Sequence, residues 1–385
     1  MPRIIVLYVS AGTGHISAAK AVGAALEKYP DVEVKVDDLF NHINDVARKT
    51  MVTGYNEIST NARALYTMLH SSLYKEDTEK ALKSNQRFTT LGRPFVHRFE
   101  KSVAEFKPDA IINTMQFPFH LLQYYAAETN TPEYACITDV SVQTSWLREN
   151  VTGYFAASNL TRDVLLARGV DPDIIHVTGI PVKLEIAEPK TPAEARQRHD
   201  LPLDKPIITI FGGGVATERI RYMVEALLKA DQPGLLTVVA GRNTELVEAL
   251  NDLKSGPKMD FRLLDYIDYV DDLVVASDLV VTKPGGLITS EVLARNTPLV
   301  VTDPVEGQEE WNGDFVCGSG AGIQLRIPEL VPPAVIALLA QPERLDKMRA
   351  QSKLVGKPRA AFDVAEIVVN ELKAGVTRRT NTIKL

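Results

Sequence analysis

The sequence is poor in cysteine and has no arrangement of residues typical of a metal site. Its two cysteines, Cys136 and Cys317, lie in apolar or glycine-rich settings, and we interpret them as buried thiols in a reducing compartment. Two separate thiols cannot form a metal cluster. The chain also lacks a convincing DxD motif, since Asp171-Pro172-Asp173 is typical of a loop before a strand. We therefore expect no metal.

The chain also lacks a positive net charge and long apolar runs. Its formal net charge of −6 argues against a nucleic-acid partner, which would require a basic surface. The first apolar run, Ile4–Val9, is far shorter than the roughly 18–20 residues that span a bilayer. The longest uncharged stretch, residues 110–127, is interrupted by Asn113, Pro118 and His120. We expect a cytoplasmic protein, peripheral on the cytoplasmic face of the cell membrane.

What the 385 residues do contain is an alternation of short apolar runs with longer helical patterns. This alternation is typical of parallel sheets covered by helices on both faces. Helices are predicted at 17–28, 218–230 and 244–253. The predicted strands are 4–9, 32–36, 110–113, 134–138, 153–157, 176–178, 207–211, 235–240, 261–264, 279–282 and 299–301.

A proline-rich and charged segment interrupts the alternation between 182 and 206. We place an N-terminal domain at 1–187, a linker with a short helix at 188–205, and a C-terminal domain with a terminal helix and tail at 206–385. The fold class is α/β, with two Rossmann-like, doubly wound domains. Ligands of such sheets bind at the carboxyl ends of the strands, so we expect a site in a cleft between the domains.

Residues 41–107 form a helical insert without a clear buried strand. The segment between Asn41 and Lys107 carries eleven Lys/Arg and seven Asp/Glu, a local charge of 11 − 7 = +4, with tyrosines and phenylalanines interleaved. Cations and aromatic rings are what contact with an anionic membrane surface requires. A solvated helical face that packs its aromatic rings inward would give the same pattern.

The first glycine loop follows the first predicted strand and contains Gly12, Thr13, Gly14 and His15. Glycines at a strand–helix turn let a ligand approach the backbone, and the helix amides favour an anion. The dinucleotide fingerprint is incomplete, because Ser17 replaces its third glycine. His15 suits acid–base chemistry, although an ordinary surface histidine would also fit this position.

Two further glycine loops lie in the C-terminal half. Gly212, Gly213 and Gly214 would allow the backbone to wrap around a phosphate, or would form a plain flexible turn. The more specific loop runs from Thr282 to Glu291, TKPGGLITSE, where the glycine amides suit a diphosphate and Thr289 or Ser290 could add hydroxyl donors or cap the helix. Glu291 is expected in the first helical turn, where it could accept the ribose hydroxyls or only complement the macrodipole.

A fourth loop, DPVEGQEEWN from Asp303 to Asn312, follows a buried strand. Gln308, Glu309 and Asn312 supply the amides and carboxylates that carbohydrate hydroxyls require. The alternative is a cap for the next helix.

In this order, the loops resemble the monogalactosyldiacylglycerol synthases and the bacterial processive diacylglycerol glucosyltransferases, relatives of MurG in glycosyltransferase family 28. The similarity covers nearly the whole chain and includes SAGTGHISAAKA (10–21), VTGIPV (177–182) and residues 278–322. The resemblance implies a GT-B fold, with two facing domains. It also implies inverting transfer of a hexose from a UDP-sugar to a membrane lipid such as diacylglycerol, with no cofactor.

The resemblance also implies residue roles. His15 would lie near the acceptor hydroxyl with Asp139 as a second acid–base candidate, and the loop of Gly12, Thr13 and Gly14 would face the acceptor or a phosphate. Together with the loops described above, the predicted donor-binding residues are Gly213, Gly214, Tyr266, Ile267, Lys283, Gly285, Gly286, Thr289, Glu291, Gln308, Glu309 and Asn312.

Three departures from the family pattern lie in the acceptor domain. Gln143 and Arg148 stand where the family usually has histidine, and Met115–Phe119 replaces a His-Pro-Phe-like segment. Other functions of the same fold stay open: a UDP-sugar epimerase, which needs no acceptor, or a non-catalytic nucleotide-sugar sensor. An NAD-dependent oxidoreductase fits least well, because of the missing third glycine.

Overall fold

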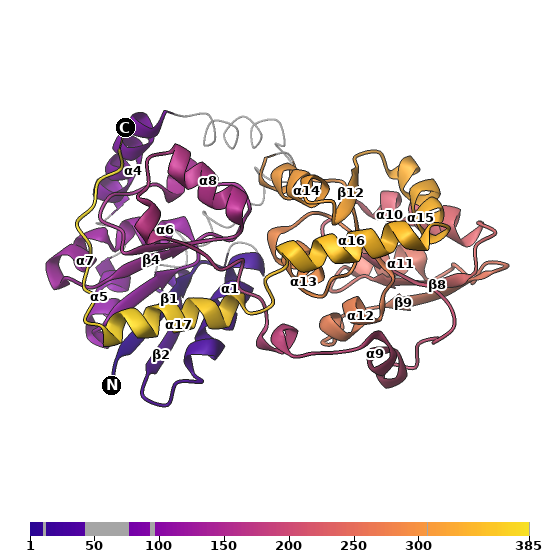
Figure 1. Cartoon of the computed structure of the whole chain (residues 1–385), viewed down its shortest axis with the longest axis horizontal. Coiled ribbons are helices and arrows are strands. Elements are labelled where there is room, and N and C mark those ends of the chain that lie inside the picture. Colours follow the sequence, from indigo (N-terminus) through magenta and orange to yellow (C-terminus); the bar gives the residue numbers. More distant parts are fainter. Residues whose placement is uncertain (11–12, 43–76, 93–96, 306, 385) are drawn as a thin grey trace. The chain divides into compact units, whose positions relative to one another are not determined.

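The computed structural model describes the chain except for residues 11–12, 43–76, 93–96, 306 and 385 (Figure 1). The chain forms two compact units. The first comprises Met1–Leu184 together with Arg359–Leu385, and the second comprises Glu185–Pro358. Each is built on a six-stranded parallel sheet, as the alternation of strands and helices predicts. Every predicted strand is present, with ends within two residues of those expected.

The sheet of the first unit has the strand order β2-β1-β3-β4-β5-β6. Its central strands are buried along their whole length, which explains why they are continuous apolar runs in the sequence. The strands are β1 (Arg3–Tyr8), β2 (Glu33–Asp38), β3 (Ala110–Asn113), β4 (Glu133–Cys136), β5 (Gly153–Ala156) and β6 (Ile175–Val177). The helices are α1 (Thr13–Leu26), α4 (Thr78–Gly92), α5 (His97–Phe106), α6 (Gln116–Leu121), α7 (Gln123–Thr129), α8 (Asn159–Ala167) and α17 (Ala360–Lys373).

Alternate residues of β1 face opposite sides of this sheet. Ile4 and Val6 join the core formed with α1 and α17, which lie side by side (Figure 1), whereas Ile5 and Leu7 join the core under α5 and α7. Small residues allow α1 to lie close to the sheet. A Cβ on Gly23 would lie only 2.3 Å from Cγ2 of Val36 on β2, so this glycine is required for the packing.

The last residues of the chain pack on the first unit, so the prediction that 206–385 forms one C-terminal domain is wrong for 359–385. The hydroxyl of Tyr134 donates to Glu371 of α17 at 2.6 Å. Beyond α17, the amide of Lys384 donates to the carbonyl oxygen of Gly169 at 3.0 Å, and Ile383 is buried. The apolar stripe of α17 is visible in the sequence, but a stripe does not specify which sheet it covers.

The sheet of the second unit has the order β12-β11-β10-β7-β8-β9. Its edge strand β12 was not predicted, because its four residues include a glycine and a glutamine and are only partly buried. The strands are β7 (Ile207–Phe211), β8 (Gly234–Val239), β9 (Met259–Leu264), β10 (Leu279–Thr282), β11 (Leu299–Thr302) and β12 (Gly322–Leu325). The helices are α9 (Pro192–Arg198), α10 (Thr217–Leu228), α11 (Thr244–Leu250), α12 (Val270–Ala276), α13 (Gly286–Ala294), α14 (Gln308–Gly318), α15 (Val331–Leu339) and α16 (Pro342–Val355).

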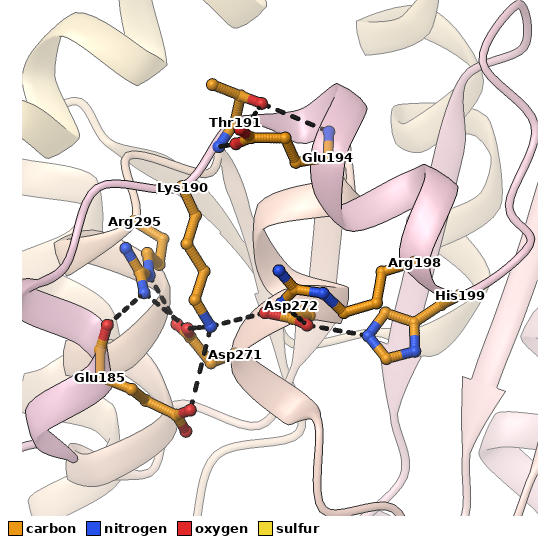
Figure 2. Close-up of polar contacts among 9 residues, drawn as sticks. All are labelled: Glu185, Lys190, Thr191, Glu194, Arg198, His199, Asp271, Asp272 and Arg295. Atoms are coloured by element: carbon orange, nitrogen blue, oxygen red, sulfur yellow. Dashed lines mark hydrogen bonds and ion pairs between the residues drawn. The ribbon is translucent and has the colours of Figure 1, made fainter.

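The predicted linker, residues 188–205, is an integral part of the second unit rather than a free connection. The short helix expected there is α9. Its start is fixed by a capping box in which Thr191 accepts from the amide of Glu194 and the Glu194 carboxylate accepts from Thr191 (Figure 2).

An ion-pair cluster fastens this segment to α12. The ammonium of Lys190 lies 2.6 Å from Asp271 and 2.5 Å from Asp272 (Figure 2). Arg295 pairs with Asp271 at 2.5 Å, and Arg198 with Asp272 at 2.7 Å. Burial opposes the charge of Asp272, but hydrogen bonds from its cationic partners hold its pKa well below the usual range. The sequence predicts a linker with a short helix here, and the structure shows that a cluster of ion pairs holds this segment to α12.

The two cysteines differ. Cys136 is buried on β4, and burial raises its thiol pKa to about 12. Cys317, predicted to be buried, is exposed on α14. No helix in the described part of the chain is long and apolar enough to cross a membrane.

Candidate functional site

The predicted phosphate loops of the second unit meet where its strand order reverses. From β7 the chain proceeds to β8 and β9 on one side, then returns to β10 on the other side of β7. Loops that diverge at such a point leave room for a ligand at the carboxyl ends of the strands. Gly212–Gly214 follows β7, and Lys283–Gly286 follows β10. The two loops touch, because Nζ of Lys283 lies 3.2 Å from the position that a Cβ on Gly214 would take.

The three consecutive glycines have different structural roles. Gly214 has a φ of +78°, a conformation that favours glycine. A Cβ on Gly212 would lie 2.4 Å from the Leu246 side chain. A Cβ on Gly213 would meet no atom within 4 Å. The fold therefore requires Gly212 and Gly214, whereas Gly213 borders open space in which a ligand could lie.

The loop after β10 leads into α13, whose N-cap residue is Gly285. The amide of Gly285 donates to the carbonyl oxygen of Lys283 at 2.8 Å, which tightens the turn. The first amides of a helix have no partner within the helix, so Gly286 and the residues after it present donors that favour an anion. This geometry agrees with a diphosphate site at Gly285 and Gly286.

Two expectations about α13 require correction. Glu291 is the sixth residue of the helix rather than part of its first turn, which contains no acidic residue. A macrodipole effect falls off within the first turn, so it does not explain this carboxylate. Neither Thr289 nor Ser290 caps the helix. The hydroxyl of Thr289 is buried without a hydrogen bond to any described residue.

The fourth loop is joined to the other two by Glu309. One carboxylate oxygen of Glu309 lies 3.1 Å from Nζ of Lys283, and the other accepts from the amide of Val305 at 2.7 Å. Gln308 is the first residue of α14, and Glu310 caps the helix by accepting from the amide of Gly307 at 3.2 Å. The helix is thus capped by Glu310, which leaves Glu309 to pair with the lysine of the phosphate loop.

Asn312 has a positioning role. Its side chain is fully buried and donates to the carbonyl oxygen of Pro284 at 3.1 Å. It thereby fixes the turn between Lys283 and Gly285. The sequence predicts Asn312 as a donor-binding residue, whereas in the structure its buried amide group supports the loop.

The predicted base-binding residues Tyr266 and Ile267 follow β9. Ile267 packs partly against the core, while Tyr266 is exposed, and the guanidinium of Arg242 lies 5.0 Å from the centre of its ring. Arg242 follows the neighbouring strand β8 and was not predicted as a site residue. A planar cation over an aromatic ring at the carboxyl end of the sheet is a surface on which a nucleobase can stack.

In the first unit, His15 lies at the corresponding point, where the strand order reverses between β1 and β3. It is in the first turn of α1, after β1. Its Nδ1 lies 2.7 Å from the carbonyl oxygen of Thr114, after β3, and 3.0 Å from the hydroxyl of Thr138, after β4. Loops from three adjacent strands thus hold this imidazole, which is partly buried rather than exposed.

These bonds define the tautomer of His15. A carbonyl oxygen only accepts, so Nδ1 must carry the hydrogen, and Nε2 then has a free lone pair. Burial lowers the pKa of His15, and the bond to Thr114 opposes this only in part. The imidazole is therefore neutral near pH 7 and suited to accept a proton.

For the other predicted residues near His15, the structure gives positions but few contacts. Asp139 directly follows Thr138 and is partly buried, so its backbone adjoins the residue that contacts His15. A Cβ on Gly14 would meet no atom within 4 Å. Thr13 begins α1, and Gly12 lies outside the described residues.

The positions that depart from the family pattern have partners of their own. Gln116 donates to Gln143 at 3.2 Å. Arg148 forms an ion pair with the fully buried Glu133 at 2.6 Å, and its guanidinium stacks 4.0 Å from the centre of the Phe119 ring. Arg148 is thus a structural cation inside the unit rather than a substitute for an exposed histidine.

Most of the basic helical insert, 43–76 and 93–96, lies outside the described residues. Its described helices, α4 and α5, carry surface pairs such as Lys83–Glu79 at 2.5 Å. Phe99 is fully buried and packs inward, whereas Phe88 is exposed. The buried Phe99 fits the interpretation in which aromatic rings pack inward, and contact with a membrane stays a prediction. The residues that the structure describes contain no group of His, Cys, Asp or Glu that could hold a metal ion.

Comparison with known proteins agrees with these features. Residues 15–182 match the family model "Monogalactosyldiacylglycerol (MGDG) synthase", and residues 192–355 match "Glycosyl transferases group 1". The processive diacylglycerol beta-glucosyltransferase of Bacillus subtilis is 26% identical over 372 residues, covering 96% of this chain and 95% of that protein. The enzyme of the same name from Bacillus licheniformis is also 26% identical, over 91% of this chain.

Solved structures show the same architecture. MurG of Acinetobacter baumannii has a TM-score of 0.63 at 15% identity, covering 96% of this chain and all of that one. A complex of S. aureus MnaA with UDP has a TM-score of 0.60 at 16% identity, over 99% of this chain. The predicted GT-B fold and the predicted resemblance are thereby confirmed.

Proposed function

We propose that this chain, a hexosyltransferase of the GT-B fold, moves a hexose with inversion from a UDP-sugar to a membrane lipid such as diacylglycerol. The observation that carries the proposal is the similarity to diacylglycerol glucosyltransferases over 96% of the chain. The geometry of the two units supports it. One holds a neutral histidine at its strand-order reversal, and the other holds converging glycine loops and a lysine at the equivalent place.

The second unit would hold the donor. Gly213, Gly214 and the amides at the start of α13 would surround the diphosphate, and Lys283 would add a positive charge. These groups stabilise the charge that develops on the leaving phosphate, so no metal is required for that purpose. Glu291 would accept the ribose hydroxyls, Tyr266 and Ile267 would meet the base, and Gln308 and Glu309 would contact the sugar.

The first unit would supply the base. The acceptor hydroxyl attacks C1 of the hexose from the face opposite the diphosphate while Nε2 of His15 takes its proton. A bond forms between the acceptor oxygen and C1, and the bond from C1 to the β-phosphate oxygen breaks with its electron pair on the phosphate. One displacement of this kind inverts the configuration at C1. Asp139 is a second candidate for the acid–base role.

The acceptor is proposed to reach the enzyme at an anionic membrane surface, on the cytoplasmic face of the cell membrane. Names of the relatives point to diacylglycerol, and the charge of +4 between 41 and 107 would favour anionic head groups. Sedimentation with anionic and neutral vesicles at low and high salt tests this contact. Binding that ignores lipid charge would contradict it.

The reaction is tested by incubating the protein with UDP-glucose, UDP-galactose or UDP-N-acetylglucosamine, each labelled in the sugar, together with vesicles containing diacylglycerol. Transfer of label from one donor into the lipid phase is the expected result, and the His15→Ala variant is the matched control. If the label stays in the sugar nucleotide and the configuration of the labelled sugar changes, the protein is an epimerase. If the protein binds the UDP-sugar but leaves it chemically unchanged, the protein is a sensor.

A further inference from the structure

We propose that the ion pair between Lys283 and Glu309 makes the donor site select the intact UDP-hexose over the product UDP. Glu309 lies 3.1 Å from Nζ of Lys283 and supplies the anion that this lysine pairs with. Side-chain exposure is 17% for Lys283 and 13% for Glu309, so water screens the pair only in part. The inference rests on the proposed function, because it assigns the diphosphate to the loops that Lys283 joins.

The position of Lys283 favours contact with a diphosphate. Its side chain runs along the backbone of Gly214, with Nζ, Cε and Cδ all within 4 Å of the point where a Cβ would be. The lysine begins the loop after β10, and its side chain therefore reaches the loop after β7. A phosphate bound by both loops comes within reach of its ammonium, and Lys283 can then exchange Glu309 for a phosphate oxygen.

Glu309 has contacts of its own that do not depend on the lysine. Its second carboxylate oxygen accepts from the amide of Val305, and the residue occupies the first turn of α14, where the helix dipole stabilises a carboxylate. The negative charge thus stays beside the diphosphate. The repulsion between this carboxylate and the diphosphate weakens ligand binding. It is offset only when the ligand has hydroxyl groups that can donate to the carboxylate, as a hexose does.

The carboxylate of Glu309 therefore affects the binding of UDP-hexose and of UDP differently. A bound UDP-hexose gives Glu309 new hydrogen-bond donors in place of the lysine. After transfer the hexose is gone, and the β-phosphate of UDP gains negative charge close to a carboxylate without a donor. Lys283 is drawn back toward Glu309, and release of UDP is favoured. Glu309 is thereby a specificity residue that limits inhibition by the product.

The decisive variant is Glu309→Gln, whose side-chain oxygen can still accept from Val305. Removing a charge about 6 Å from the β-phosphate at an effective dielectric constant of about 40 tightens UDP binding by about tenfold. UDP-glucose gains less or loses affinity, because a carboxylate that accepts from the sugar is replaced by an amide. Isothermal titration with UDP and with UDP-glucose measures both constants, and the inhibition constant of UDP in the transfer assay falls in parallel.

The neighbouring Glu310→Gln variant is the matched control, because Glu310 pairs with Arg326 and caps the helix instead of contacting Lys283. Its UDP affinity is expected to equal that of the unmodified chain. Circular dichroism checks that each variant is folded.

The results separate this inference from the proposed function. If the unmodified chain binds UDP and Glu309→Gln binds it no more tightly, the ion pair has no role in selection and the inference is wrong, while the proposed function stands. If the unmodified chain binds neither UDP nor UDP-glucose, both are overturned. Tighter UDP binding in Glu310→Gln as well would reduce the effect to overall charge and would also overturn the inference.

Discussion

The imidazole of His15 donates from Nδ1 to the carbonyl oxygen of Thr114, 2.7 Å away, although 99 positions separate the two residues in the sequence. The bond joins the loop after β1 to the loop after β3. It selects the tautomer with a free lone pair on Nε2, which is the form that a general base requires.

Replacement of His15 is the most direct test of the proposed mechanism. His15→Ala is expected to lower turnover by about 10²–10⁴-fold, as for the loss of a general base, while the dissociation constant of UDP stays unchanged. His97→Ala, at an exposed position at the start of α5, is the matched control and should keep full turnover. Full turnover in His15→Ala would remove this residue from the mechanism.

The pH dependence of transfer follows from the same environment. Burial lowers the pKa of His15 below its ordinary 6.5, so the neutral form persists to lower pH than for an exposed histidine. We expect kcat/KM to stay constant as pH falls to 6.5, then to drop tenfold per unit once pH passes below the lowered pKa. A pH–rate profile measures this directly. A decline that begins above pH 6.5 would contradict the assignment of His15 as the base.

Local patterns in the sequence predicted most of the fold, because each central strand of a parallel sheet is an apolar run followed by a turn. The glycine loops were predictable for the same reason, since Gly285 and Gly286 mark a strand–helix turn. Strand β12 was missed because Gly322 and Gln324 break the apolar run of an edge strand. The pattern fails where burial is partial.

Relationships between distant segments could not be predicted from these patterns. The sequence places Gly214 and Lys283 in separate loops, and only the strand order of the sheet brings them together. The apolar stripe of α17 does not encode its packing against α1. Likewise, the prolines and charges between 182 and 206 predict a linker, but the sequence does not show that Lys190 pairs with the buried Asp271 and Asp272.

Gly213 provides a test of the donor site that does not disturb the fold. A methyl group at this position meets no protein atom within 4 Å, so Gly213→Ala should unfold at the same urea concentration as the unmodified chain. If the diphosphate lies against this glycine, UDP binding weakens at least tenfold, because backbone and phosphate can no longer approach closely. Gly241→Ala is the comparison variant. A Cβ on Gly241 also meets no atom within 4 Å, but the φ of +63° is strained for alanine, so this variant is expected to lose stability.

Glu291 is expected to bind the ribose of the donor. Glu291→Ala should weaken binding of UDP-glucose by about 1–3 kcal/mol through loss of a charged hydrogen-bond acceptor. Binding of UDP should weaken equally, because both ligands carry the ribose, and this distinguishes Glu291 from Glu309. Glu343→Ala, on the exposed side of α16, is the control. Unchanged affinity in Glu291→Ala would show the ribose assignment to be wrong.

The ion-pair cluster between the segment 188–205 and α12 predicts a loss of stability when its central cation, Lys190, is removed. Lys190 faces Asp271 and Asp272, whose side chains are only 3% and 7% exposed. Lys190→Met leaves these two carboxylates with fewer partners, although Arg295 and Arg198 still pair with them. Because those partners remain, we expect a loss of about 1–3 kcal/mol, less than is typical when a buried ion pair is broken completely.

The loss should appear in the second unit, and the two tryptophans allow each unit to be followed separately. Trp146 lies in the first unit and Trp311 in the second, so urea unfolding of a Trp146→Phe background reports on the second unit alone. Lys205→Met, which removes an exposed partner of Asp260, is the control and should leave the midpoint unchanged. If Lys190→Met has the same urea midpoint as the Trp146→Phe background, the ion-pair cluster adds nothing to stability. The segment would then be held to α12 by its apolar contacts and by the stacking of His199 on Tyr269.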